Sequence, residues 1–213
     1  MIEVFAPYNV PPFLKGRGRD MRVLWALEEL GLPYEIRWLD MGNGEHKAPA
    51  FRAVNPFGKI PAIKDGGKAL FESGAILLHL AEKAGKLGGA KGTDEPGLVR
   101  QWCFAAVNTV ETPFLELFAC DTFWKDQPNI QERRATAFEN VKTKLSELEP
   151  VLAANDYVAG GFSVADVLLG HVLTAPMEDS AFAGAPKSSA YVTGLKRRPA
   201  YERAFALHLT GPK

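Results

Sequence analysis

Three groups in this chain could together bind a small peptide: the Ile60-Pro61 bond, the carboxylate of Glu72 and the hydroxyl of Ser73. Glu72 and Ser73 directly precede a helical pattern, so the Ser73 hydroxyl and the unpaired N–H groups of the first turn would suit a carboxylate. Glu72 beside them would suit an ammonium, and the pair would recognise an α-amino acid group. Ile60-Pro61 lies at a tight corner, where a cis bond would leave the Ile60 N–H and C=O for a ligand backbone.

The elements around these residues must bring them together. Asn55-Pro56 predicts a turn, and Pro61 must stand at a strand start or edge because proline cannot donate to a ladder. Asp65-Gly66-Gly67 predicts a hairpin turn, and Ser73 is expected to be the N-cap of a helix over Gly74–Ala84. Ser73 alone is better explained as an ordinary helix cap, because such caps are common, but the compact order of all the parts favours a binding function.

This segment resembles the cytosolic glutathione transferases. Its residues are most similar to those of the phi-like and related bacterial members. The resemblance is carried by Gly44-Glu45-His46-Lys47, Asn55-Pro56-Phe57-Gly58, Ile60-Pro61-Ala62 and Leu70-Phe71-Glu72-Ser73. It implies a cis Ile60-Pro61 bond, pairing of Ile60 with the cysteinyl backbone of glutathione, and Glu72-Ser73 on the γ-glutamyl end. It also implies a basic residue for the glycyl carboxylate, and His46, Lys47 and Lys59 complete the expected glutathione-binding set.

The group that activates the glutathione thiol is harder to identify. In the family a Ser, Cys or Tyr just after the first strand lowers a thiol pKa that is ordinarily near ~8.5. This sequence departs from that pattern, because Pro11–Arg22 contains no Ser, Thr, Cys or Tyr. The candidates are Tyr8 first, Arg19 second and Asn9 third. The competing interpretations are a buried aromatic at a strand end for Tyr8 and a solvated basic loop for Arg19.

The element order predicts an α/β thioredoxin-like N-terminal domain over residues 1–84 and an all-α C-terminal domain over residues 98–213. The N-terminal pattern is strand, helix, strand, then hairpin and helix, with Asp20 as the cap of the first helix. Residues 85–97 are rich in Gly, Lys and acids and are the predicted linker. Ser163-Val164-Ala165-Asp166 predicts a capping box with a folding role and no chemistry.

The second substrate is expected to be a small hydrophobic electrophile that lies against the helical domain. The aromatic residues that would line its pocket are Trp102, Phe104, Phe114, Phe118, Phe123 and Trp124. Helical cores also use such residues, so any single one of them is better explained by packing. Cys103 and Cys120 fit small buried hydrophobes. The four histidines are isolated from one another and from the cysteines, so no metal site is predicted.

The composition excludes several partners. Hydrophobic residues make up 46% and charged residues 23%, as in ordinary globular proteins. The formal net charge of zero gives no electrostatic case for nucleic acid or an anionic membrane. The sequence shows no signal-peptide pattern and no apolar run of membrane-spanning length, so a cytoplasmic protein is expected. The resemblance implies a homodimer.

Two classes of function remain open. The first is a glutathione S-transferase that activates the thiol for attack on a hydrophobic electrophile. The second is a non-catalytic protein of the same fold that binds glutathione or apolar ligands. A glutathione-dependent thiol transferase or peroxidase is a further alternative, disfavoured because no cysteine follows the first strand. Isomerase action on a maleyl-type substrate is disfavoured because the serine-rich loop of those relatives is missing.

Overall fold

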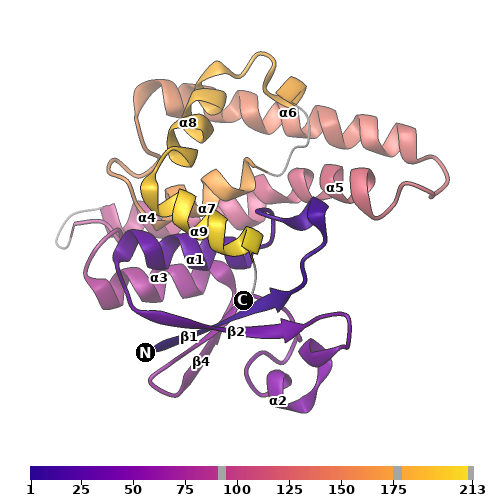
Figure 1. The fold of residues 1–213 in the computed structure, drawn as a ribbon. Coiled ribbons are helices and arrows are strands. Elements are labelled where there is room, and N and C mark those ends of the chain that lie inside the picture. Colours follow the sequence, from indigo (N-terminus) through magenta and orange to yellow (C-terminus); the bar gives the residue numbers. More distant parts are fainter. Residues whose placement is uncertain (91–94, 175–178, 211–213) are drawn as a thin grey trace. The chain divides into compact units, whose positions relative to one another are not determined.

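The computed structural model describes residues 1–90, 95–174 and 179–210, and these form two compact units (Figure 1). The first unit contains Met1–Lys86 together with the C-terminal segment that begins at Arg198. The second unit is Leu87–Arg197 and is helical.

A four-stranded mixed sheet, in the order β2-β1-β3-β4, forms the centre of the first unit. The strands are β1 (Ile2–Tyr8), β2 (Tyr34–Asp40), β3 (Ala62–Asp65) and β4 (Lys68–Phe71). β1 pairs in parallel with β2 and antiparallel with β3, and β3 turns back into β4 at the predicted hairpin. The arrangement is thioredoxin-like, and the predicted fold is confirmed.

Helices cover both faces of this sheet (Figure 1). The helical elements are η1 (Pro12–Leu14), α1 (Asp20–Leu30), η2 (Glu45–Lys47), α2 (Pro49–Arg52), α3 (Ser73–Ala84) and α9 (Pro199–Thr210). Ile2, Val4 and Ala6 are buried toward α1 and α3, because alternate residues of a strand face the same side. Phe5 points to the other side, where its ring packs 5.4 Å from that of Phe51 in α2.

The last helix, α9, packs on α1 and groups with the first unit, whereas the predicted helical domain of residues 98–213 included it. Arg198, just before α9, donates to both carboxylate oxygens of Glu29 at 2.5 and 2.9 Å. The rings of Trp25 and Tyr201 meet edge to face at 5.0 Å. The sequence pattern identified the helix but not the core that it covers, because periodicity reports an apolar face and not its partner. Of the predicted linker over residues 85–97, residues 91–94 lie outside the described residues.

The second unit is built around α7, whose nine residues are all buried. A helix that is apolar on every side belongs in the interior of a bundle. Its elements are α4 (Glu95–Phe104), the π-helical turn η3 (Ala105–Val110), α5 (Glu111–Thr122), α6 (Ile130–Ala154), α7 (Val164–Val172), η4 (Asp179–Phe182) and α8 (Pro186–Lys196). The π turn η3 therefore separates α4 from α5.

The capping box at the start of α7 is confirmed. The carboxylate of Asp166 accepts hydrogen bonds from the Ser163 N–H at 2.8 Å, the Ser163 hydroxyl at 3.0 Å and the Val158 N–H at 3.0 Å. It also accepts one from the Tyr191 hydroxyl at 2.7 Å. Burial raises the pKa of Asp166, in opposition to these bonds. Asp166 therefore joins the start of α7, the preceding loop and α8.

We expect Asp166→Asn to lower the free energy of unfolding by about 2–4 kcal/mol, because an amide nitrogen would face buried donors that now meet a carboxylate. Urea unfolding followed by circular dichroism measures this loss. The matched control is Asp156→Asn, at an exposed position of the preceding loop, where a change within about 0.5 kcal/mol is expected. Equal losses in both variants would contradict the structural role of Asp166.

The β3–β4 hairpin is tied to α3 through Asp65. His79 Nε2 lies 2.8 Å from Asp65 Oδ2, and Lys83 donates to Oδ1 at 3.0 Å. His79 and Lys83 are one helical turn apart, so they reach the same carboxylate. The hydrogen bond from His79 and the bond and charge of Lys83 hold the pKa of Asp65 below its ordinary value, although burial opposes them.

This pKa shift predicts the pH dependence of the difference between wild type and Asp65→Asn. A carboxylate with a lowered pKa in the folded state stabilises the protein above its unfolded pKa of about 3.9, and this contribution disappears as the pH falls through the folded value. The wild type should therefore be more stable than Asp65→Asn near pH 6, and the difference should shrink below about pH 4. Urea unfolding across this range measures it, and a difference that grows in acid would contradict the assignment.

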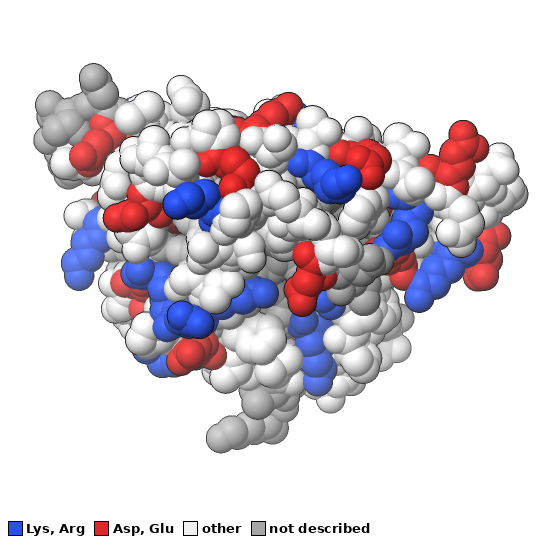
Figure 2. Space-filling model, turned by 90° about the horizontal axis from the view of Figure 1, so that it is seen from above, with Lys and Arg blue, Asp and Glu red and all other residues white. Residues whose placement is uncertain are grey.

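Charged side chains are spread over the surface without a large area of one sign on the face shown in Figure 2. This agrees with the formal net charge of zero. Among residues 1–90, 95–174 and 179–210, no helix combines the length and the apolar character that crossing a bilayer requires.

Candidate functional site

Strand register brings the predicted peptide-binding groups to one edge of the sheet. Ala62 of β3 pairs with Phe5 of β1 on one side and with Phe71 of β4 on the other. Ile60-Pro61 immediately precedes Ala62, and Glu72-Ser73 immediately follows Phe71. Because β3 and β4 are antiparallel, these two pairs lie side by side at the same end of the hairpin.

The carboxyl end of β1 meets the same edge. Tyr8, the last residue of β1, is opposite Asp40 at the end of the parallel strand β2. β1 runs antiparallel to β3, so Tyr8 lies beyond the point where the β1–β3 ladder ends and beside the segment that carries Ile60. The loop from β1 to α1 and the loop after β2 both leave from this edge.

The Ile60-Pro61 peptide bond is cis, as predicted. The β3 ladder starts only at Ala62, so the backbone of Ile60 lies outside it. The preceding corner is held by the buried Asn55, whose side-chain amide donates to the Lys59 carbonyl at 2.6 Å. Asn55 Oδ1 also accepts the N–H of Phe57 at 3.1 Å. Asn55 therefore positions the backbone that leads to Ile60, a role the sequence analysis did not assign.

Glu72 and Ser73 differ in one respect from the prediction, because Ser73 is not the N-cap of α3. The helix begins at Ser73, and the cap position belongs to Glu72, which has a φ of 68° and a ψ of 112°. Non-glycine residues rarely adopt positive φ, and such residues concentrate at functional positions. The Glu72 side chain is exposed, whereas Ser73 is buried. The expected carboxylate and ammonium receptors are thus adjacent, with the acid held in an unusual backbone conformation.

The hydroxyl of Ser73 accepts a hydrogen bond from a residue that no local signal in the sequence marks as part of the site. Arg22 of α1 is 1% exposed, and its Nη1 donates to Ser73 Oγ at 3.1 Å. Arginine can only donate, so Ser73 acts as the acceptor here and its own O–H can point to another group. A buried guanidinium beside this hydroxyl also favours a bound anion. In the sequence, Arg22 is one charged residue in an amphipathic helix, and this pattern does not indicate that its side chain is buried.

The three candidates for thiol activation all lie exposed on the loop side of this edge. Tyr8 is 38% exposed, and its hydroxyl makes no hydrogen bond with the described part of the chain. It shares its strand parity with Val4 and Ala6, so it faces the side of the sheet on which α1 and α3 pack. Asn9 follows with a φ of 52°, and Arg19 occupies the N-cap position of α1. Asp20, the predicted cap, is instead the first residue of the helix and is buried.

The predicted basic residues gather at a neighbouring corner. His46 and Lys47 belong to η2, which follows β2 at this edge. Gly58 approaches the His46 carbonyl oxygen so closely that a side chain on Gly58 would overlap it. Lys59 follows Gly58 and is exposed, as is Lys47, while His46 is half-buried. The three basic side chains therefore come from two segments that touch.

The predicted pocket aromatics of the helical unit differ in exposure, and Trp102, Phe118 and Trp124 are half-buried. Phe114 is 1% exposed and belongs to the core, whereas Phe104 and Phe123 are 68% and 61% exposed. Cys103 and Cys120 are both buried thiols, and burial raises the pKa of Cys103 to about 12. Neither cysteine therefore has the exposed thiolate that nucleophilic chemistry requires.

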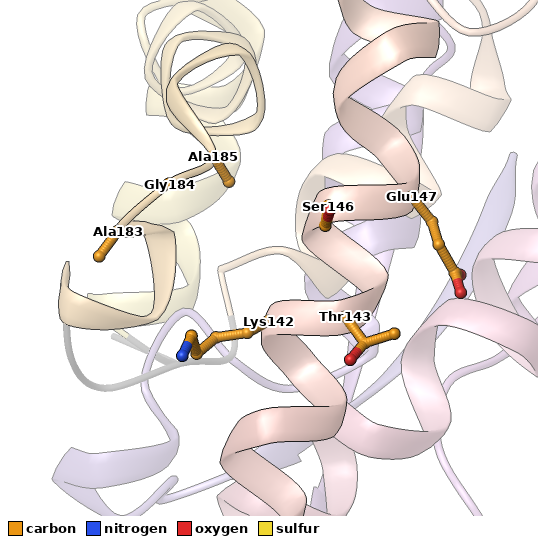
Figure 3. Close-up of a pocket in the computed structure, with 7 residues that line it drawn as sticks. All are labelled: Lys142, Thr143, Ser146, Glu147, Ala183, Gly184 and Ala185. Carbon is orange, nitrogen blue, oxygen red and sulfur yellow. The ribbon is translucent and has the colours of Figure 1, made fainter.

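A hollow of about 410 Å³ lies in the helical unit (Figure 3). It is lined by Lys142, Thr143, Ser146, Glu147, Ala183, Gly184 and Ala185. Lys142 pairs with Glu139, and Glu147 pairs with Lys144, so its charged side chains are matched locally. None of the predicted site residues lines this hollow, and its paired charges give it no chemistry.

Comparisons with known proteins point to one family. Residues 21–83 match the family model described as the glutathione S-transferase N-terminal domain. Glutathione S-transferase 4 of Zea mays is 33% identical over 188 residues, which cover 84% of this chain and 83% of that protein. Glutathione S-transferase F9 of Arabidopsis thaliana is 33% identical and covers 78% of this chain and 77% of its own length.

A solved structure agrees with these relatives. The glutathione transferase URE2P6 of Phanerochaete chrysosporium, crystallised with oxidized glutathione, superposes with a TM-score of 0.85 at 26% identity. The superposition covers 98% of this chain and 96% of that chain. The likeness therefore extends over the sheet unit and the helical unit.

The Arg22–Ser73 contact predicts the strength of carboxylate binding. We expect Ser73→Ala and Arg22→Met each to weaken binding of glutathione about ten- to a hundredfold, because each removes a hydrogen bond that involves a charged group. Isothermal titration calorimetry measures the affinity. Arg37→Met is the matched control, since Arg37 is an exposed arginine in the outer strand β2, paired with Glu3 and Glu35. Equal weakening by Arg37→Met would show a general charge effect and contradict the assignment.

Proposed function

The chain belongs to the glutathione S-transferase family, and from that premise we propose that its sheet edge binds glutathione and ionises its thiol for attack on an apolar electrophile. One observation carries the proposal. Three neighbouring strands place their flanking residues at the same edge: Tyr8 at the end of β1, the cis Ile60-Pro61 bond before β3, and Glu72-Ser73 after β4. The buried Arg22 is hydrogen-bonded to Ser73. Backbone groups, an anion receptor and a hydroxyl are thereby set side by side.

Each part of glutathione has a proposed partner at this edge. The γ-glutamyl carboxylate would accept from the Ser73 hydroxyl and the first N–H groups of α3, where the helix dipole also favours an anion. Its ammonium would pair with Glu72. The cysteinyl backbone would bond to the N–H and C=O of Ile60, which lie outside the sheet ladder. Pro61 would fix this orientation.

The glycyl carboxylate would lie at the basic corner formed by His46, Lys47 and Lys59. These residues come from η2 and from the turn before β3, and the two segments are in contact at Gly58. The exposed ammonium groups of Lys47 and Lys59 and the half-buried imidazole of His46 would pair with a carboxylate that is flexible at the surface. Their individual contributions are small, because solvent screens exposed charges.

Tyr8 is the proposed donor to the sulfur. Its hydroxyl lies at the strand end beside the Ile60 segment and makes no hydrogen bond with the described residues, so it remains available to a thiolate. Arg19 is proposed to add positive charge at the N-terminus of α1, and Asn9 is the third candidate donor. One hydrogen bond to a charged acceptor is worth about 1.5–3 kcal/mol, which corresponds to about 1–2 units of thiol pKa.

A thiol-transfer mechanism through a protein cysteine has no support in this arrangement. Both cysteines are buried in the helical unit, and burial raises the pKa of each thiol. The glutathione sulfur itself is therefore the proposed nucleophile. The exposed rings of Phe104 and Phe123 are proposed to contribute to the apolar surface that receives the electrophile.

We also propose that the protein acts as a homodimer in the cytoplasm. Phe57 is 66% exposed on the turn before Ile60, and its ring is steadied by an edge-to-face contact of 5.8 Å with Phe71. An exposed aromatic with a supported ring suits burial against a second copy.

Steady-state turnover of glutathione with chlorodinitrobenzene tests the proposed function. We expect Tyr8→Phe to lower kcat/KM about ten- to a hundredfold below the thiol pKa and to raise that pKa by about 1–2 units. Ultraviolet titration of the bound thiolate measures the pKa directly. Tyr157→Phe, which removes a hydroxyl in the helical unit, is the matched control and should leave both quantities unchanged.

Other outcomes of this experiment also decide between interpretations. If Asn9→Ala or Arg19→Met abolishes turnover while Tyr8→Phe does not, the activating group is that residue and the assignment of Tyr8 is wrong. Tight binding of glutathione without turnover against a broad panel of electrophiles would contradict the transferase function. It would leave a glutathione-binding protein of the same fold.

A further inference from the structure

The segment Gly16-Arg17-Gly18-Arg19 joins η1 to α1 on the loop that should carry thiol activation, yet nothing in the proposed chemistry requires its glycines. Gly16 is buried and has a φ of 76°, in the left-handed region that favours glycine. A Cβ on Gly16 would overlap the ring of Phe205, and a Cβ on Gly18 would overlap Asp20 and crowd His208. Phe205 and His208 both belong to α9. The two glycines therefore make room for the C-terminal helix.

His208 makes the most specific contact between α9 and this loop. Its Nδ1 accepts the backbone N–H of Gly16 at 3.0 Å in a buried environment. Since an N–H donates to Nδ1, that nitrogen carries no hydrogen, and the ring hydrogen is assigned to Nε2. Nε2 lies 3.1 Å from Asp20 Oδ2 without the alignment of a strong hydrogen bond. His208 thus spans from the loop to the first turn of α1.

Other contacts fix α9 on α1 independently of His208. Arg198 and Glu29 form a two-point ion pair, and Arg203 donates to Glu28 at 2.6 Å. Because these contacts lie farther along α1, α9 stays anchored when the loop changes. The His208–Gly16 hydrogen bond therefore fixes the loop to α9, which is itself anchored on α1.

We propose that His208 is a positioning residue for thiol activation. It acts by holding the backbone of Gly16 through the hydrogen bond to Nδ1. The proposal rests on the proposed function. Gly16 is three residues before Arg19, and the loop that contains both begins at Tyr8 and Asn9. Release of Gly16 would free the middle of this loop, so the groups at its two ends would lose their fixed distance from the glutathione sulfur. A hydrogen bond placed imprecisely stabilises a thiolate less.

Three substitutions separate the two ring nitrogens of His208. In His208→Asn, the amide oxygen takes the approximate place of Nδ1 and keeps an acceptor for Gly16. In His208→Gln, the longer amide reaches the place of Nε2, so it faces Asp20 but leaves Gly16 without its acceptor. His208→Leu removes both contacts. Arg203→Met is the matched control, because it removes an exposed ion pair of the same helix that does not reach the loop.

Two readouts test the proposal on the full-length chain. Amide hydrogen exchange over residues 13–19 reports the loop, and ultraviolet titration of bound glutathione reports the thiol pKa. We expect His208→Gln and His208→Leu to exchange about five- to tenfold faster in this segment. We also expect them to raise the thiol pKa and to lower kcat/KM for glutathione with chlorodinitrobenzene about tenfold. His208→Asn and Arg203→Met should remain within about threefold of the wild type.

Several results would overturn the proposal. One is unchanged exchange and an unchanged thiol pKa in both His208→Gln and His208→Leu. Another is a loss in His208→Asn as large as that in His208→Leu, since it would show that the acceptor for Gly16 is not what matters. A similar loss in Arg203→Met would assign the effect to general loosening of α9. If His208→Leu does not fold, the contrast between His208→Asn and His208→Gln decides.

Failure of the proposed function looks different. A wild type that binds glutathione but never turns over would contradict the transferase function. The exchange of residues 13–19 and the titration of the bound thiol would still decide whether His208 holds the loop and tunes the sulfur.

Discussion

The pairing of β3 with both of its neighbours is the constraint on which the site depends. Ala62 lies in register with Phe5 on one side and Phe71 on the other, so a shift of one residue would turn every side chain of β3 to the opposite face. The register is fixed because Ala62 and Ile63 are fully buried on opposite faces of the sheet. The same register fixes where the backbone of Ile60 joins the ladder and where Glu72 caps α3. Packing of the sheet therefore sets the geometry of the binding edge.

Buried polar groups then secure the elements around this edge. Arg22 joins α1 to α3 through Ser73, Asn55 holds the corner before Ile60, and Asp65 ties the hairpin to α3. Arg22 and Asp65 have partners in another element, whereas the partners of Asn55 lie within four residues of it. Polar groups are costly to bury without such partners. They specify one arrangement of the elements, which apolar packing alone would leave less exact. In the helical unit, Asp166 has the same role between α7 and α8.

Local signals in the sequence predicted the parts of this structure that depend on neighbouring residues. The hairpin at Asp65, the cis bond before Pro61 and the capping box at Ser163 were each visible within a few positions. Contacts between distant segments were not. Residues 199–207 have a helical pattern, but this pattern does not show that α9 packs on α1, because an apolar face does not identify the element that covers it. Ser73 was expected as a cap for the same reason, since its actual partner Arg22 is 51 positions away.

The loop after β1 shows why this limit matters most for the chemistry. Its sequence has no hydroxyl between residues 11 and 22, which made thiol activation the weakest part of the sequence prediction. In the structure the loop owes its shape to Phe205 and His208, from the other end of the chain. A loop rich in glycine has many accessible conformations and would not hold a donor by itself. External contacts can restrict it, and the conformation of the loop then depends on the C-terminal helix. Gly16 and Gly18 resemble a flexible linker in the sequence. In the structure they are glycines because the loop packs too closely against α9 and Asp20 to accommodate a side chain.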